Sequence, residues 1–206
     1  SVANRTTTGE RYNFLIISAP QYKNDPLLAH YLELKRMQGL AYKVVSTDDI
    51  GGTPMEIKSY IFDHKNCGIE YLLLIGNNSD IPAYSWPFSM STNGNGWTLS
   101  DYWYGCMGDS VGDDKHYNQE IAVGRFCVSN VSELHNMINK HLSYSTPKDS
   151  TNNWIKKVLL VAHKQGNEYA GYEYEECLDN TWAKYNAYAD FSTQYCFGKK
   201  FKSSPK

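Results

Sequence analysis

Acidic and amide side chains gather in two stretches of the sequence, and their oxygens are the ligands that a hard cation such as calcium prefers. One stretch directly follows an apolar run, and the other is a loop rich in aspartate. Together they supply the candidate ligands Asn77, Asp80, Asp109, Asp113, Asp114 and Glu120. Their spacing is not that of an EF-hand loop, so a solvated acidic loop is the simpler alternative.

A second group of side chains is placed to face a substrate. His163 and Gln165 follow the apolar run 157–162, and the carboxyl ends of strands are where an open α/β sheet presents its functional residues. Asp101 lies within an aromatic stretch and would orient a loop or line a cleft. We predict these three residues to face a cleft, with structural hydrogen bonding as the alternative.

The five cysteines are poor candidates for a nucleophile. Their odd number and the lack of C-x-x-C spacing argue against a full disulfide framework and a structural zinc site. Cys67 is expected at the carboxyl end of a helix, where the dipole disfavours a thiolate. Cys127 follows a predicted buried strand and is expected to be a small core residue.

The elements that must position these side chains are organised around the apolar run 71–75, which is bounded by Gly68 and Gly76. A short, unbroken apolar run is typical of a strand that is covered on both faces in a parallel sheet. Asn77 and Asp80 then fall at the carboxyl end of that strand, where ligands bind in open α/β sheets.

Strands and helices alternate along the first part of the chain, which predicts a parallel sheet with right-handed crossovers. Each of the first two helices opens with a cap residue and a proline at its first position, Asp25-Pro26 and Thr53-Pro54. The predicted strands are 13–18, 42–46, 71–75 and 120–126, and the predicted helices are 25–39, 53–64 and 129–142.

Residues 84–117 interrupt this alternation with a long segment rich in glycine, asparagine and aromatic residues. We expect an irregular, functional or mobile segment with one short strand over 101–106. Trp86, Trp97 and Trp103 would form a stacking platform for peptide or glycan, or pack over the sheet edge.

Residues 147–153 read as a linker, after which the pattern restarts. A strand over 157–162, a helix within 168–188 and a strand over 194–197 are predicted, whereas the basic stretch 199–206 lacks an apolar pattern. Because these few elements do not close a core, we expect the beginning of a second, truncated α/β subdomain. The predicted domains are 1–150 and 151–206.

Composition excludes several classes of function. The 206 residues carry 20 basic and 22 acidic side chains, a net charge of −2, and no basic cluster stands out, which argues against a nucleic-acid partner. No apolar run is long enough to cross a bilayer. The first residues lack the apolar core of a signal peptide, although the missing initiator methionine is consistent with removal of one.

Several motifs in order resemble the gingipain family of cysteine endopeptidases over about residues 12 to 166. They are Glu-Tyr-Leu-Leu-Leu-Ile-Gly-Asn-Asn-Ser-Asp-Ile-Pro at 70–82, Ser-Asp-Tyr-Trp-Tyr-Gly at 100–105, His-Tyr-Asn at 116–118 and Ile-Ala-Val-Gly-Arg-Phe at 121–126, then Trp154 and the stretch 157–163. The resemblance implies two adjoining α/β subdomains, the second caspase-like, a structural calcium ion in the first, and a secreted or surface-bound protein.

The family's catalytic pair is a histidine within Gly-His-Gly and a cysteine after a later strand of the second subdomain, and this sequence contains neither. His163 lacks flanking glycines, and Gln165 falls close to an acidic residue that supports the histidine in some members. The sequence is therefore predicted to be the amino-terminal portion of a peptidase, inactive without the missing catalytic subdomain.

Two other functions are compatible with parts of this sequence. A non-catalytic α/β module that binds peptide or glycan through its aromatic loop is the main alternative. A flavodoxin-like domain is disfavoured because no glycine-rich phosphate loop follows the first strand.

Overall fold

The computed structural model describes residues 11–90, 94–108, 110–111, 118–145, 157–160, 190–197 and 200–203. The chain divides into two compact units, Ser1–Ser145 and Thr146–Lys206. The predicted linker 147–153 and the predicted helix within 168–188 lie outside the described residues. The domain boundary after residue 150 stays a prediction.

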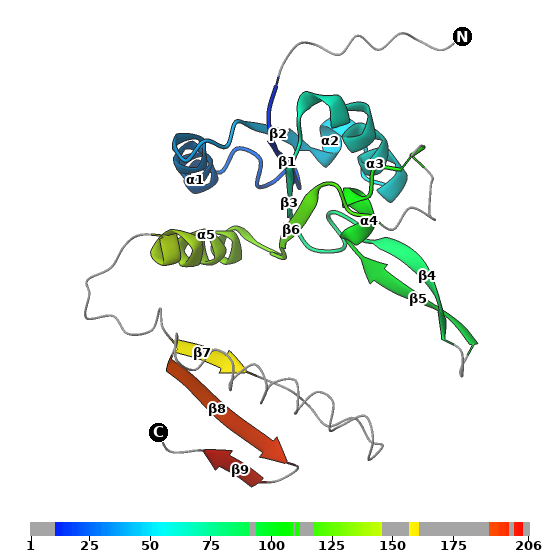
Figure 1. The fold of residues 1–206 in the computed structure, drawn as a ribbon. Helices are drawn as coiled ribbons and strands as arrows, with labels where there is room; N and C mark the ends of the chain where they lie inside the picture. Colours follow the sequence, from blue (N-terminus) through cyan, green and yellow to red (C-terminus); the bar gives the residue numbers. More distant parts are fainter. Residues whose placement is uncertain are drawn as a thin grey trace, which may run out of the picture. The chain divides into compact units, whose positions relative to one another are not determined.

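The first unit is built on a four-stranded sheet in which every neighbouring pair is parallel, as predicted (Figure 1). Its strands are β1 (Phe14–Ser18), β2 (Tyr42–Ser46), β3 (Tyr71–Ile75) and β6 (Ala122–Phe126), in the spatial order β2-β1-β3-β6. The predicted α/β fold class is confirmed.

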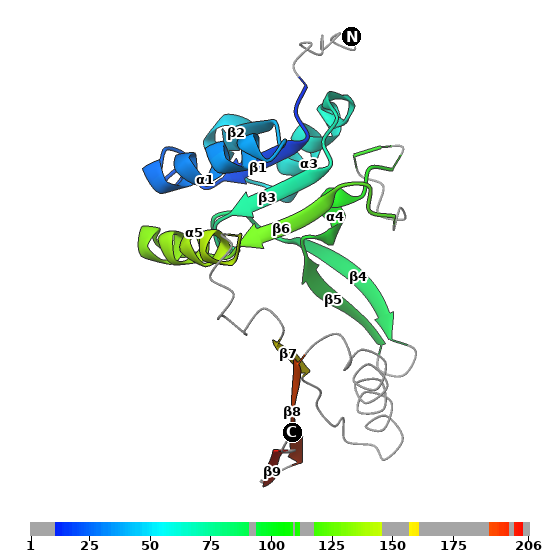
Figure 2. The same ribbon diagram turned by 60° about the vertical axis from the view of Figure 1, so that its left-hand side comes forward.

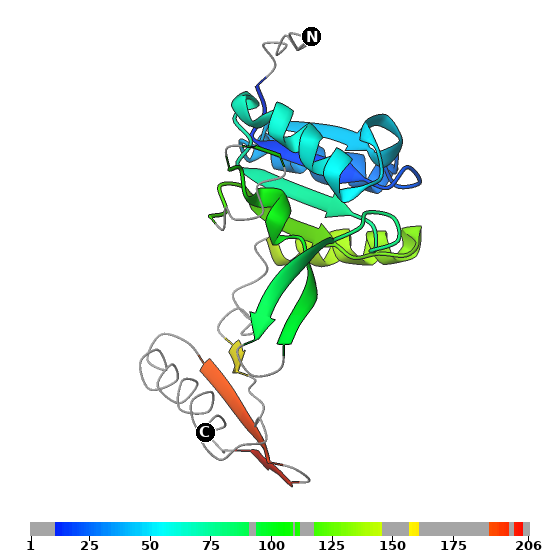
Figure 3. The ribbon, with the colours of Figure 1, turned by 90° about the vertical axis from the view of Figure 1, so that its right-hand side faces the viewer.

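Helices cover both faces of this sheet. The helices α1 (Pro26–Met37) and α5 (Val131–Ser145) lie on one face (Figure 2), and α2 (Thr47–Ile50), α3 (Pro54–Asp63) and α4 (Tyr102–Gly105) lie on the other (Figure 3). A short 3-10 helix, η1 (Lys65–Cys67), follows α3. No described helix is long and apolar enough to span a membrane.

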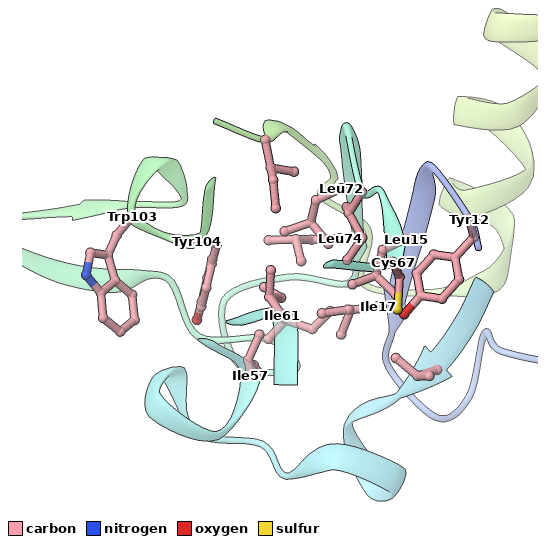
Figure 4. Close-up of a cluster of buried hydrophobic side chains, with 14 residues drawn as sticks. Tyr12, Leu15, Ile17, Ile57, Ile61, Cys67, Leu72, Leu74, Trp103 and Tyr104 are labelled. Atoms are coloured by element: carbon pink, nitrogen blue, oxygen red, sulfur yellow. The ribbon is translucent and has the colours of Figure 1, made fainter. Parts of the chain in front are cut away.

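Strand alternation divides the core into two clusters. Leu15, Ile17, Leu72 and Leu74 face α3 and α4 (Figure 4), where Ile57, Ile61, Trp103 and Tyr104 meet them. Phe14, Ile16, Leu73 and Ile75 face α1 and α5. Each fully buried leucine or isoleucine contributes about 1.5–3 kcal/mol, so the central strands are held from both faces.

The helix starts follow the predicted caps. The Asp25 carboxylate accepts hydrogen bonds from the backbone N–H groups of Leu27 and Leu28. At α3 the side chains and backbone of Thr53 and Glu56 form a reciprocal capping box.

Two predictions for the segment after β3 are wrong. The first part of the segment expected to be irregular forms an antiparallel hairpin of β4 (Tyr84–Met90) and β5 (Gly94–Ser100), since its glycine and proline residues mask strand alternation. The expected strand over 101–106 is the one-turn helix α4. Its aromatic residues suit a strand, but the turn lets Trp103 and Tyr104 both enter the core.

The prediction for Cys127 is also wrong. Its side chain is exposed, and the next residue, Val128, takes the core position beside Phe126. Phe126 and Val128 keep the alternation of β6 and pack in the same cluster, so Cys127 lies on the opposite side, one residue beyond the end of the strand, where it is exposed.

The second unit contains three described strands, β7 (Lys157–Leu160), β8 (Asp190–Phe197) and β9 (Lys200–Ser203). The strands β7 and β8 pair in parallel, and β8 and β9 pair antiparallel. The strand predicted at 157–162 is confirmed over its described residues 157–160, and the strand predicted at 194–197 is the second half of β8. The strand β9 arises in a stretch that showed no apolar pattern.

Candidate functional site

The carboxyl ends of the parallel strands bring together the loops that follow β1, β3 and β6. The four strands are paired without offset, so Ser18, Ser46, Ile75 and Phe126 end the sheet at the same level. This rim is where an open α/β sheet binds ligands.

A tight turn follows β3 at the centre of the rim. The Asn77 Oδ1 atom accepts the N–H groups of Ser79 and Asp80 at 2.8 and 3.1 Å, and Asp80 Oδ2 accepts Asn77 N–H at 3.2 Å. Gly76 adopts φ 143°, and a Cβ atom there would lie 2.9 Å from Asp80 Cβ. The turn therefore requires glycine before it.

Arg125 on β6 ties three parts of the rim together. Its Nε and Nη2 atoms donate to Asp101 Oδ2 and Oδ1 at 2.7 and 2.6 Å, and Nη1 donates to the carbonyl oxygens of Gly76 and Asn77 at 3.0 and 3.3 Å. Both charged side chains are largely buried, at 12% and 25% exposed. The bidentate pair fixes the junction between the hairpin and α4 against the turn after β3.

Further polar contacts link the neighbouring loops. Gln21 Nε2 donates to Asp80 Oδ1 at 3.2 Å, and Asn77 Nδ2 donates to Ser129 Oγ at 3.3 Å. The loops after β1, β3 and β6 are thereby joined into one hydrogen-bonded framework.

The described metal candidates do not form one cluster. Asn77 and Asp80 lie after the carboxyl end of β3, whereas Glu120 precedes β6 and accepts the N–H of Met107 at 2.7 Å at the amino end of the sheet. A five-residue strand separates these ends by roughly 15 Å. No group of three or more histidine, cysteine or acidic residues suited to a metal occurs in the part of the chain that the structure describes.

Asp109, Asp113 and Asp114 lie outside the described residues, but the ends of their loop are described. The bridge between Cys106 and Gln119 closes this loop beside Glu120. Calcium therefore stays a prediction.

Of the three residues predicted to face a cleft, only Asp101 is described, and its carboxylate is occupied by Arg125. His163 and Gln165 lie outside the described residues. In the ranges that the structure covers, no cysteine thiol is hydrogen-bonded to a histidine, so a nucleophile and its base are not found there.

Sequence reasoning missed two functional groups, Arg125 and Lys58. Each is a charge within an apolar pattern, and such a charge requires a buried partner. The Lys58 side chain is 1% exposed, and its ammonium donates to the carbonyl oxygens of Trp103, at 2.6 Å, and Cys106. Burial lowers the pKa of Lys58 to about 8, although the electrostatic attraction of Cys106 and Glu120 raises this pKa.

The chain resembles known proteins along most of its length. The model of the family described as Peptidase family C25 matches residues 7–204. Gingipain R2 of Porphyromonas gingivalis is 26% identical over 198 residues, which cover 94% of this chain and 24% of the relative. Gingipain R1 of the same species is 26% identical over 204 residues, covering 96% of this chain and 18% of the relative.

Two solved structures share the fold. The crystal structure of the Arg-specific cysteine proteinase gingipain R superposes with a TM-score of 0.69 and 22% identity, covering 93% of this chain and 42% of that one. A complex of the Porphyromonas gingivalis RgpB pro- and mature domains superposes with a TM-score of 0.68 and 20% identity, covering 90% of this chain and 42% of that one. The chain therefore spans less than half the length of these relatives.

Proposed function

The chain belongs to peptidase family C25, and from that membership we propose that it is the amino-terminal portion of the catalytic region of a gingipain-like cysteine endopeptidase. The observation that carries the proposal is the family match over residues 7–204, combined with a span of only 24% of gingipain R2. The remainder of the relatives' length leaves room for a separate catalytic subdomain.

In this role the first unit would support the catalytic subdomain and contribute part of one wall of the substrate cleft. A cysteine peptidase needs a thiolate, an imidazole within hydrogen-bond reach and donors for the oxyanion. The sequence lacks the Gly-His-Gly motif, so these groups would come from the remainder of the polypeptide. The rim framework of Arg125, Asp101 and the turn after Gly76 supports the wall by holding its loops in one geometry.

The substrate would be a protein or peptide chain, and the protein would be secreted or held at the cell surface like the gingipains that it resembles. A structural calcium ion near Glu120 is the proposed cation. If it binds there, excess calcium raises the melting temperature and a chelator lowers it, because a ligand that binds only the folded state stabilises that state. A melting temperature that neither treatment moves would remove calcium from the proposal.

Hydrolysis of a reporter peptide tests the proposed function. The chain of residues 1–206 should be inactive, whereas the same chain extended through the following coding sequence should cleave the peptide and lose activity with a thiol reagent. Cleavage by the 206-residue chain itself, blocked by that reagent, would overturn the proposal. An extended polypeptide that does not cleave would favour the alternative, a non-catalytic module that binds peptide or glycan.

A further inference from the structure

The hairpin of β4 and β5 begins and ends at the rim of the sheet. It follows the turn after β3, and after β5 the chain returns to the rim at Asp101, whose carboxylate is held by Arg125 of β6. Figure 3 shows the hairpin extending beyond the sheet and the helices of the first unit. Because ligands of an open α/β sheet bind at this rim, the hairpin stands beside the expected binding position.

Two contacts fix the base of the hairpin to the first unit. The Tyr84 ring stacks on Trp103 of α4, with the ring centroids 3.8 Å apart and an angle of 17° between the ring planes. The N–H of Ala83, the residue before β4, donates to Asn78 Oδ1 at 2.8 Å. The start of β4 is therefore tied both to α4 and to the turn after β3.

The hydroxyl of Tyr104 adds a third tie between α4 and this base. The Tyr104 side chain is buried beside Trp103 (Figure 4), and its hydroxyl donates a hydrogen bond to the carbonyl oxygen of Pro82, two residues before β4. Burial raises the pKa of Tyr104 above its ordinary value, so the hydroxyl keeps the proton that it donates. Tyr104 therefore holds the point from which the hairpin leaves the rim.

Just beyond this base, the described side chains of the hairpin are open to solvent. Ser85, Thr98 and Leu99 are exposed, and Leu99 keeps 62% of its side chain accessible. Each strand of the hairpin has seven residues, a length of roughly 20 Å. A small rotation at the base is amplified along such an arm, so the position of its tip depends on the contacts at the base.

We propose that Tyr104 is a positioning residue of the substrate cleft, because it sets the direction of the hairpin and thereby the surface that meets the outer residues of a bound peptide. This role rests on the proposed function, in which the first unit supplies part of the cleft wall. Since the thiolate and imidazole come from the remainder of the polypeptide, the hairpin affects how tightly a long peptide binds and leaves the chemical step unchanged. Such a loss of binding raises KM and not kcat.

The test compares two substrates of the polypeptide extended through the following coding sequence. One is a single blocked residue with a chromogenic leaving group, and the other is a peptide of about ten residues with the same residue before the scissile bond. Tyr104→Phe removes only the hydroxyl and should raise KM for the long peptide about threefold to tenfold. KM for the short substrate and kcat for both should stay unchanged.

The matched control is Tyr31→Phe, which removes the hydroxyl of a tyrosine buried on the other face of the sheet. It should leave KM unchanged for both substrates. A merely structural role of Tyr104 would reduce the active fraction and lower the apparent kcat for both substrates alike. That result, or no effect on either substrate, would overturn the positioning role. If the native extended polypeptide cleaves neither substrate, the proposed function is refuted and this role with it.

Amide hydrogen exchange tests the tie itself on the chain of residues 1–206, without any substrate. Exchange at Ala83, whose N–H is bonded to Asn78, should be faster in Tyr104→Phe than in the native chain. Exchange at Leu73, in the central strand β3, should stay slow and shows that the variant is folded. Unchanged exchange at Ala83 would show that the hydroxyl does not hold the base of the hairpin.

Discussion

The guanidinium of Arg125 and the carboxylate of Asp101 meet through two parallel hydrogen bonds of 2.7 and 2.6 Å, 24 residues apart in sequence. The same guanidinium also holds two carbonyl oxygens of the turn after β3. One side chain therefore connects β6, the central turn and the start of α4.

Breaking this ion pair should lower the free energy of unfolding far more than breaking an exposed ion pair. We expect Asp101→Asn to lower the free energy of unfolding by about 2–4 kcal/mol, since it leaves a largely buried guanidinium without its counter-charge. The matched control is Glu33→Gln, which breaks the exposed pair of Glu33 and Arg36 and should leave the free energy of unfolding nearly unchanged, because solvent screens such a pair. Urea denaturation of both variants measures the difference, and equal losses would contradict the structural role.

Gly76 should not tolerate a side chain. Its φ of 143° and the 2.9 Å approach to Asp80 Cβ both oppose Gly76→Ala, which we expect to destabilise the protein by about 2 kcal/mol. Gly39→Ala isolates the effect of φ, because Gly39 has φ 96° with open space around it. In thermal unfolding, Gly76→Ala should have a lower melting temperature than Gly39→Ala. The reverse order would exclude crowding by Asp80.

Lys58 should make stability depend on alkaline pH. Burial lowers the pKa of Lys58 to about 8 from 10.5, so between these values the unfolded state binds more protons than the folded state. The free energy of unfolding contributed by this group therefore rises with pH across that window. Denaturant unfolding at neutral and alkaline pH should show a larger rise for the native chain than for Lys58→Met. The exposed control Lys140→Met should behave like the native chain.

Asp25 should contribute stability that is lost in acid. Burial raises the pKa of this carboxyl, but the N–H of Leu28, the contact with His135 and the N–H of Leu27 outweigh it, so the pKa lies below the ordinary 3.8. The contribution is complete above the unfolded-state pKa and disappears as pH falls through the folded-state value. Asp25→Ala should cost about 1–2 kcal/mol near neutral pH.

The control for Asp25 is acid titration of unfolding. The difference in stability between the native chain and Asp25→Ala should shrink as the carboxyl protonates, and a constant difference down to strongly acidic pH would show that the carboxylate charge is not involved.

Elements whose form depends on neighbouring residues in the sequence were predicted correctly. The unbroken apolar run 71–75 and the caps at Asp25 and Thr53 specify β3, α1 and α3 through burial and capping alone. The hairpin and α4 escaped prediction because their form depends on distant partners. Trp103 and Tyr104 belong to a helical turn since the core formed by Ile57 and Ile61 receives both.

The candidate site was predictable in position but not in composition. Its place after β3 followed from the sheet, and Asp101 was identified from its aromatic surroundings. Arg125 was not, although a guanidinium in the strand Ala-Val-Gly-Arg-Phe demands a buried acceptor. Which acidic residue supplies that acceptor depends on how the fold brings distant parts of the chain beside Arg125.

The four strands of the sheet are of equal length and end level with one another. Each connecting loop at that rim can consequently be lengthened, shortened or exchanged without shifting the layers below. Related proteins could acquire new binding preferences through such insertions while keeping the same sheet and helices. The rim is therefore the part of the fold where binding properties can change most freely during evolution.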